Sequence, residues 1–153
     1  MHSVLFVCTA NICRSPMAMG LWRDMIKDRA DEWVVESAGT WAPEGEPAAQ
    51  RTQLVLQELG IELRDHRSRQ VNRQMLSQFN LILVMERGHK EALQVEFPEI
   101  ARNVYLLSEM IGANFEIQDP IGMSTAEFFH TRNEISQILT TGSEKIHRLA
   151  GES

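Results

Sequence analysis

What this sequence lacks excludes several classes of protein. It contains only two cysteines, Cys8 and Cys13, which are too few and too close together for a disulfide framework. In a reducing compartment such a pair indicates reactivity rather than cross-linking. The five histidines are scattered, and no His/Cys cluster has the spacing of zinc ligands. We therefore expect a protein that binds no metal ion, and because the sequence contains no cofactor-binding motif, we expect no cofactor.

The chain also lacks a long hydrophobic run and an excess of positive charge. The apolar stretch Val4–Val7 is far shorter than a signal-peptide core or a membrane span, so we expect a cytoplasmic protein with no membrane segment. A net charge of −6 argues against nucleic acid as a partner, and an anionic substrate must be held by local positive groups. The length of 153 residues predicts one domain, residues 1–153, of unspecified oligomeric state.

Strand and helix patterns alternate along the chain. The expected strands are Ser3–Val7, Trp33–Ala38, 80–85 and 103–107. The expected helices are 15–30, 48–59, 89–97 and one from near Ser124 with periodic apolar residues as far as Leu149. This order predicts an α/β fold of the flavodoxin-like or Rossmann-like kind, with a four-stranded parallel sheet flanked by helices on both faces. The loops after parallel strands share one edge of the sheet, which carries the site.

The loop after the first strand places a cysteine six positions before an arginine, in the stretch FVCTANICRSP. The five residues between them, Thr9–Cys13, are enough to curl backbone N–H groups around a tetrahedral oxyanion. A helix follows at once, with Ser15 as its expected N-cap and Pro16 at its first position, and it adds its positive end. Arg14 offers its planar guanidinium group to two oxygens of the anion. The positive charge of Arg14 and of the helix start also stabilises a thiolate on Cys8.

This segment, Cys8–Arg14, is called the cysteine loop below. It lacks the Gly-Lys-Ser/Thr ending of a nucleotide-binding P-loop. Taken alone, its spacing is a weak pattern, and a packed cysteine beside a solvated arginine is the alternative interpretation. The position between a buried strand and a helix start favours an anion site.

Further segments, spread over essentially the whole chain, accompany this loop. They are VCTANICRSPMA (7–18), ESAGT (36–40), DHRSRQV (65–71), LILVMERGH (81–89) and DPIG (119–122). Together and in this order they resemble the low-molecular-weight protein tyrosine phosphatases. The resemblance implies a metal-independent enzyme that hydrolyses phosphotyrosine in a phosphorylated protein substrate through a phosphocysteine intermediate.

The resemblance also implies a role for the residues of the loop. Cys8 is the expected nucleophile, and Arg14 and the loop amides are expected to hold the phosphoryl oxygens. Ser15 matches the hydroxyl that stabilises the cysteine as a thiolate leaving group. Asn11 is of a residue type that tolerates a left-handed backbone, and Ser37 is expected to support it. The full set of expected phosphate-binding and loop-supporting residues is Thr9, Ala10, Asn11, Ile12, Cys13, Ser15 and Ser37.

The second requirement is a proton donor, because a phenolate leaving group has a pKa of about 10 and leaves poorly at neutral pH. Asp119 is the only aspartate in the loop after the fourth strand, at the edge that carries Cys8. The family's Asp-Pro acid matches Asp119, which would protonate the leaving oxygen and then activate water. The alternative is that Asp119 and Pro120 merely start a turn.

A further stretch resembles a family segment that supports the site from outside. His66, Arg69 and Gln70 match it, and Glu86 stands where the family often has an aspartate partner for this histidine. We therefore expect Glu86 to contact His66. Two interpretations stay open for the basic residues here, a solvated face or a substrate-steering patch: Arg64, Arg67, Arg69 and Arg73.

The expected substrate mouth departs from the family pattern. Ile121 and Gly122 follow Asp-Pro where family members often carry tyrosines, and Trp41 is the expected aromatic wall unless it is an ordinary loop tryptophan. The DPIG form is closer to bacterial members, including protein-arginine phosphatases, although that branch usually has threonine at the position of Ile12. A protein-arginine phosphatase on the same scaffold is therefore the alternative function.

Two further alternatives concern the cysteines. A non-catalytic oxyanion-binding or redox-sensing module would keep the loop without needing a proton donor. The related arsenate reductases need further cysteines, and none follows Cys13. Cys13 itself is either a resolving cysteine, which traps an oxidised Cys8 as a disulfide, or a packing residue.

Overall fold

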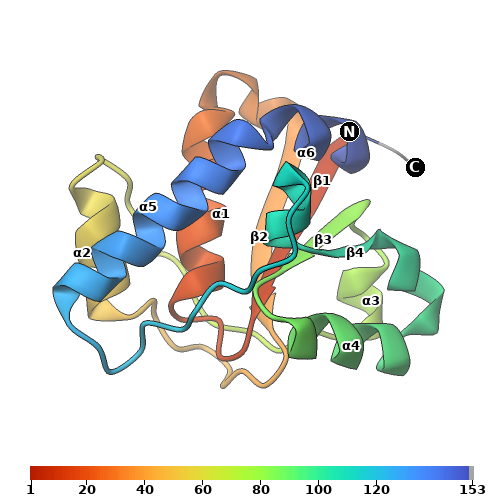
Figure 1. Ribbon diagram of the computed structural model, residues 1–153, viewed down its shortest axis with the longest axis horizontal. Coiled ribbons are helices and arrows are strands. Elements are labelled where there is room, and N and C mark those ends of the chain that lie inside the picture. The colour runs from red at the N-terminus through yellow and green to blue at the C-terminus, as the bar shows by residue number, and fades with distance from the viewer. Residues whose placement is uncertain (152–153) are drawn as a thin grey trace.

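A four-stranded parallel sheet forms the centre of the computed structural model, which describes residues 1–151 (Figure 1). Its strands, in the order β2-β1-β3-β4, are β1 (His2–Cys8), β2 (Trp33–Gly39), β3 (Leu81–Val84) and β4 (Val104–Leu106). The helices are α1 (Arg14–Met25), α2 (Gln50–Gln57), α3 (Arg73–Leu76), α4 (Arg87–Glu96), α5 (Thr125–Thr141) and α6 (Ser143–Ala150). The expected α/β fold with a parallel sheet is confirmed.

Alternating side chains of the central strand β1 point into two separate cores. Val4 and Phe6 pack on the face covered by α1, α2, α5 and α6, whereas Leu5 and Val7 pack on the face covered by α3 and α4 (Figure 1). Because helices cover both faces, β1 and β3 are apolar without interruption, as is typical of a parallel sheet. Across residues 1–151, no helix combines the length and the apolar character needed to cross a bilayer.

The expected helix 15–30 differs from the observed α1 at both ends. It begins at Arg14 with Cys13 as the N-cap residue, and no side chain caps it. The prediction that Ser15 is the N-cap, with Pro16 at the first helical position, is therefore wrong. The Ser15 hydroxyl instead contacts Cys8. At its other end α1 stops at Met25, and a 3₁₀ helix follows at Lys27–Glu32.

The expected last helix is in fact two helices that meet at Gly142. A Cβ atom at Gly142 would lie 2.8 Å from the Cβ of Met110 and 2.9 Å from its carbonyl oxygen. The close approach of the neighbouring chain therefore requires glycine here. The start of α5 agrees with the prediction, because Ser124 is its N-cap and accepts a hydrogen bond from the N–H of Glu127.

A cluster of rings closes the amino end of the sheet, opposite the loops that follow the strands. His2 stacks on Trp33 with 4.8 Å between ring centroids, and Trp33 meets Trp22 edge to face at 5.3 Å. His147 of α6 packs on the same two indoles. This cluster ties the C-terminal helix to the first residues of β1 and β2, far from the carboxyl edge where Cys8 ends its strand.

Candidate active site

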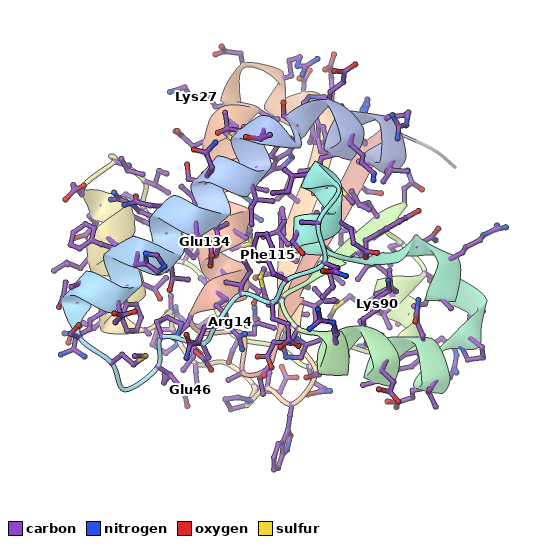
Figure 2. All side chains as sticks on the ribbon, in the orientation of Figure 1. Arg14, Lys27, Glu46, Lys90, Phe115 and Glu134 are labelled. Atoms are coloured by element: carbon purple, nitrogen blue, oxygen red, sulfur yellow. The ribbon has the colours of Figure 1, made fainter. Side chains whose placement is uncertain are left out.

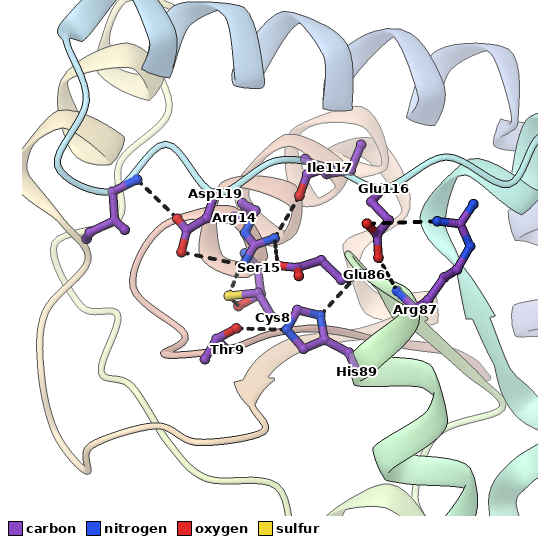
Figure 3. Close-up of polar contacts among 11 residues, drawn as sticks. Cys8, Thr9, Arg14, Ser15, Glu86, Arg87, His89, Glu116, Ile117 and Asp119 are labelled. Atoms are coloured by element: carbon purple, nitrogen blue, oxygen red, sulfur yellow. Dashed lines mark hydrogen bonds and ion pairs between the residues drawn. The ribbon is translucent and has the colours of Figure 1, made fainter.

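The cysteine loop connects the end of β1 to the start of α1 (Figure 3). Within residues 1–151, the backbone N–H groups of Thr9, Ala10, Asn11, Ile12 and Cys13 donate no hydrogen bond to another group. Consecutive unpaired amides beside the positive end of a helix form an anion-binding concavity. The loop therefore has the geometry expected of an oxyanion site.

Asn11 fixes the shape of this loop. Its φ of 59° is in the left-handed region, as the sequence predicts for an asparagine here. Its side chain accepts a hydrogen bond from the N–H of Arg69 (3.0 Å) and donates to the hydroxyls of Ser15 (2.7 Å) and Ser37 (3.0 Å). His66 Nε2 contacts its carbonyl oxygen at 2.8 Å. Four contacts thus hold one buried residue, which keeps the neighbouring amides in place.

The sulfur of Cys8 lies against the start of α1. Ser15 Oγ is 3.0 Å from the sulfur, and the backbone N–H of Ser15 is directed at it over 3.4 Å (Figure 3). Because the Ser15 oxygen already accepts a hydrogen bond from Asn11 Nδ2, its own hydrogen can point at the sulfur, which is closer to it than the alternative acceptor, the Ala38 carbonyl oxygen at 3.4 Å. The structure thus brings Cys8 and Ser15 together as expected, with hydrogen-bond donors directed at a sulfur that would carry negative charge.

Arg14 lies at the start of α1 (Figure 2) and is held mainly through one nitrogen. Its side chain is 1% exposed, and its Nη1 donates to Glu86 Oε2 (2.5 Å) and to the carbonyl oxygen of Ile117 (2.7 Å), while its Nη2 lies 3.5 Å from Asp119 Oδ2 (Figure 3). Its Nε has no partner within the described residues, although it is buried. A buried donor without a partner is unfavourable, so the free edge of the fork fits an oxyanion.

Glu86 therefore does not have the role that the sequence suggested. The expected contact with His66 is wrong, because Glu86 binds Arg14 while His66 contacts the Asn11 carbonyl. Glu86 is the N-cap residue of α4. Spacing in the sequence could not distinguish these two partners.

The chain places Asp119 at the same edge of the sheet. It belongs to the Asp119 segment (residues 112–124), which links the 3₁₀ helix Leu107–Ile111 to α5. Its carboxylate is 37% exposed, lies 3.5 Å from Arg14 Nη2, and accepts a hydrogen bond from the N–H of Ile121 (3.1 Å) (Figure 3). A cleft of about 640 Å³ opens here, lined by Glu86, Glu116, Ile117, Gln118 and Asp119.

The two residues expected at the substrate mouth are both exposed. The backbone N–H of Trp41 donates to the carbonyl oxygen of Thr9, but its side chain is 84% exposed. Ile121 is 50% exposed on the Asp119 segment. An apolar indole in water beside the cysteine loop is available to a ligand, although no described side chain packs it as a fixed wall.

Cys13 points away from solvent and joins the hydrophobic core on the α1 face. Burial raises the pKa of its thiol to about 12, and the negative charges of Asp119 and Cys8 add to this effect. The thiol is therefore protonated at neutral pH, which slows any attack on an oxidised Cys8. Its packing role is visible, and the resolving role stays a prediction.

Two supporting residues were not assigned a role from the sequence. His89 Nδ1 accepts from the N–H of Glu86 (3.1 Å), so Nε2 carries the hydrogen and donates to Thr9 Oγ1 (2.8 Å) (Figure 3). Burial, helped by the charge of Arg14, lowers the pKa of His89 and favours this neutral form. Gly39 approaches the loop so closely that a Cβ atom would lie 2.3 Å from the Thr9 carbonyl oxygen.

Comparisons with known proteins agree with this geometry. Residues 3–149 match the family described as low molecular weight phosphotyrosine protein phosphatase. A protein-arginine-phosphatase of Geobacillus stearothermophilus is 34% identical over 146 residues, which cover 95% of this chain and 96% of that protein. A low molecular weight protein-tyrosine-phosphatase of Streptomyces coelicolor is 39% identical over 129 residues, covering 78% and 77%.

A solved structure extends the agreement to the fold. The low molecular weight protein tyrosine phosphatase from T. tengcongensis superposes with a TM-score of 0.90 at 37% identity, over 95% of this chain and 99% of that one. The chain therefore belongs to the low molecular weight phosphotyrosine protein phosphatase family, as the resemblance of its motifs implied. The family is one of hydrolases that act on phosphorylated proteins.

Proposed function

We propose that this protein hydrolyses phosphotyrosine in proteins, without a metal ion, through a phosphocysteine intermediate. The observation that carries the proposal is the sulfur of Cys8 at the base of a ring of unpaired amides, 3.0 Å from the Ser15 hydroxyl. Such amides stabilise the charge that develops on the equatorial oxygens during phosphoryl transfer, together with the Arg14 fork.

The first step is displacement at phosphorus. The Cys8 thiolate forms the S–P bond while the bond from phosphorus to the tyrosine oxygen breaks, and Asp119 gives its proton to the leaving oxygen. The position of Asp119, 3.5 Å from Arg14 Nη2, puts the acid within reach of a phosphoryl group held by that guanidinium. The acid is needed because the leaving group would otherwise depart as a phenolate, whose conjugate acid has a pKa of about 10.

The second step is hydrolysis of the phosphocysteine. Water attacks phosphorus, its proton passes to the Asp119 carboxylate, and the S–P bond breaks to return the thiolate. The Ser15 hydroxyl and N–H, both directed at the sulfur, stabilise the departing thiolate. Inorganic phosphate then leaves.

At the mouth of the site we assign Trp41 and Ile121 to contacts with the substrate ring. This assignment is supported by the exposure of both residues: Trp41 is exposed beside the cysteine loop, and Ile121 is exposed on the Asp119 segment. Aromatic and apolar contacts of this kind favour an aryl phosphate over an alkyl one.

Phosphoarginine is the second candidate substrate, and the observation that favours it is the 34% identity to a protein named protein-arginine-phosphatase. The two activities are separated by comparing rates on matched phosphotyrosine and phosphoarginine peptides. We expect the phosphotyrosine peptide to be hydrolysed faster than the phosphoarginine peptide. We expect Ile12→Thr to shift the ratio of the two rates toward phosphoarginine. A higher rate on phosphoarginine with Ile12 in place would reverse the assignment of substrate while keeping the mechanism.

The primary test is hydrolysis of p-nitrophenyl phosphate by the purified protein in EDTA. Activity should persist with the chelator, because no step uses a metal ion. Loss of activity in EDTA that returns with a divalent cation would overturn the cysteine mechanism. A module that only binds oxyanions would bind vanadate and show no turnover at all.

We also assign the protein to the cytoplasm. The chemistry of the cysteines supports this assignment. Both are free thiols, and the proposed mechanism needs Cys8 in the reduced form, which a reducing compartment maintains. Fractionation of the cells that make the protein tests this, and recovery outside the cytoplasmic fraction would contradict it.

A further inference from the structure

A second pocket lies behind the cysteine loop. It has a volume of about 530 Å³ and opens between α1, the end of β2 and the segment of residues 62–69. Neither Cys8, Arg14 nor Asp119 lines it. It is thus separate from the cleft beside Asp119, and the proposed catalytic steps make no use of it.

The lining of this pocket has a small excess of positive charge, because it holds four arginines (Arg23, Arg64, Arg67 and Arg69) and three acidic residues (Glu36, Glu62 and Asp65). Glu62 pairs with Arg64 (3.2 Å), and Glu36 is neutralised by two other arginines. Arg23 Nη2 lies 3.4 Å from one carboxylate oxygen of Glu36, and Arg69 Nη2 lies 3.1 Å from the other. Arg69 is further fixed because its Nε donates to the Ser37 carbonyl oxygen. Glu36 therefore offers little repulsion to an incoming anion, and it holds two guanidinium groups at the rim.

Other donors in the pocket are free. Arg67 uses only its Nη1, which donates to the carbonyl oxygens of Arg64 and His66, so its Nε and Nη2 have no partner within residues 1–151. Met19 and Leu63, which are 3% and 7% exposed, contribute a small apolar surface to the same pocket. The lining thus offers positive charge beside an apolar surface, which suits a ligand with an anionic head and an apolar body.

The pocket is a locally positive place in an acidic protein. The pKa of His66 is lowered, first by burial and then by the charges of Arg23, Arg69 and Arg67. His66 is neutral as a result, and its ring does not compete with the arginines for an anion. The net charge of −6 for the whole chain makes this concentration of guanidinium groups stand out.

Residues that line this pocket also hold the cysteine loop. Ser37 Oγ accepts from Asn11 Nδ2, the Arg69 N–H donates to Asn11 Oδ1, and His66 Nε2 contacts the Asn11 carbonyl oxygen. Three of the four side-chain and backbone contacts that fix the left-handed residue therefore come from the pocket wall. A ligand that shifts this wall by a few tenths of an ångström shifts the amides that bind phosphate.

We propose that this pocket is a regulatory site for a small amphipathic anion, which has one sulfonate, carboxylate or phosphate group on an aromatic or aliphatic body. The anion binds the free donors of Arg67 and the rim arginines, and its body covers Met19 and Leu63. Occupancy changes the turnover number through Asn11 and leaves the active site open to substrate.

The test uses 1-naphthalenesulfonate as the probe and the full chain, labelled with ¹⁵N and saturated with vanadate so that the cysteine loop is occupied. We expect the amide resonances of Ser37 and of residues 62–69 to shift on titration both with and without vanadate, and the two dissociation constants to differ by the coupling through Asn11, without displacement of either ligand. The Arg64→Glu/Arg67→Glu variant should bind the probe roughly tenfold more weakly or worse. The matched variant Arg102→Glu, an exposed arginine elsewhere, should bind as the wild type does.

Three results would overturn the proposal. Displacement of the probe by vanadate would place it in the active site, and unchanged binding by the double variant would remove the arginines as its ligands. An unchanged turnover number at saturating probe and saturating substrate would remove the coupling. Because the shifts are read on the wild type, they count even if the double variant fails to fold. Failure of vanadate to bind would instead count against the proposed function, and the probe titration would still report on the pocket.

Discussion

The two halves of the active site are held in different ways. The cysteine loop is anchored by side chains from three separate parts of the chain, namely His66, Ser37 of β2 and His89 of α4. The Asp119 segment is fixed mainly at Ile117, which is buried and whose N–H donates to the Met85 carbonyl oxygen. Beyond that point the Asp119 carboxylate is 37% exposed and Ile121 is 50% exposed, although Pro120 between them is buried.

This difference separates two tasks. Binding a phosphoryl group requires many amides in one arrangement, so the structure encloses the loop in a network with few degrees of freedom. The proposed acid, Asp119, would have to accommodate different leaving groups and allow product release, and a partly exposed segment permits both. Changes in the loop should therefore affect every substrate alike, whereas changes in the segment should depend on the leaving group.

The largest expected effect comes from the centre of the loop. Cys8→Ser should lower turnover by roughly 10⁴-fold or more, because the hydroxyl is a far weaker nucleophile than a thiolate. Hydrolysis of p-nitrophenyl phosphate measures this, with urea unfolding as the control for folding. Turnover that survives the change would show that the loop only binds oxyanions and that another group does the chemistry.

Asp119→Asn should lower turnover about 10²- to 10³-fold on phenyl phosphate, since the amide cannot donate a proton in the required way. The loss should be smaller on p-nitrophenyl phosphate, whose leaving group needs less protonation. Asp24→Asn, on the exposed face of α1, is the matched control and should behave as the wild type does. Equal losses on the two substrates would argue that Asp119 acts by position rather than as an acid.

Gly39→Ala tests how rigidly the loop is enclosed. The new Cβ would lie 2.3 Å from the Thr9 carbonyl oxygen and 3.1 Å from the Asn11 nitrogen, so one of the two must move. We expect a loss of about 1–3 kcal/mol in the free energy of unfolding, together with reduced turnover on all substrates. Gly88→Ala, where no atom lies within 4 Å of the new Cβ, should change neither quantity appreciably.

A change of pH should weaken the loop rather than the Asp119 segment. Burial lowers the pKa of His66 and His89 below the ordinary 6.5. As the pH falls, the unfolded chain takes up protons first, so stability is complete above about pH 6.5 and declines as the pH falls through the lowered values. Urea unfolding at about pH 7.5 and about pH 5.5 measures the decline.

The histidines can be tested separately in the same experiment. His89→Gln should flatten the decline with pH, because one buried group no longer has to accept a proton. His130→Gln, at an exposed position on α5, should leave the slope unchanged. A slope that is the same in all three proteins would mean that His89 does not contribute, and would leave the acid sensitivity to His66, His2 and the carboxylates.

The smallest expected effect concerns Cys13. Peroxide should inactivate the protein and dithiothreitol should restore it, because a sulfenic acid on Cys8 can be trapped as a disulfide. With its pKa raised to about 12, Cys13 attacks slowly, so Cys13→Ser should reduce the recovered activity only modestly. Identical recovery in wild type and variant would leave Cys13 with its packing role alone.

Local spacing was enough to predict the elements of the site that lie close together in sequence. Cys8 ends β1, and Arg14 and Ser15 begin the helix that follows it. Because the loops after parallel strands meet at one edge of the sheet, Asp119 was expected beside them. The left-handed Asn11 followed from the residue type. The strands were likewise predicted to within one residue at each end. For β1 and β3 the signal was a continuous apolar run, which is typical of a strand covered on both faces.

The contacts that the sequence did not reveal all join distant segments. Glu86 is 72 positions from Arg14, and His89 is 80 positions from Thr9, so no periodicity relates them. Ser15 was misassigned as a cap for a local reason: a serine before a proline is typical of a helix start, but α1 begins one residue earlier, at Arg14. Gly39 marked only the end of a strand in the sequence, although its lack of a side chain is what admits the loop.

The exposed indole beside the loop gives the protein its own optical reporter. Trp22 and Trp33 are buried against each other at the amino end of the sheet, whereas Trp41 is 84% exposed at the carboxyl end. Emission at long wavelength should therefore originate from Trp41 alone. Quenching or a blue shift of that component would follow the arrival of a phosphorylated peptide in real time, with no label attached.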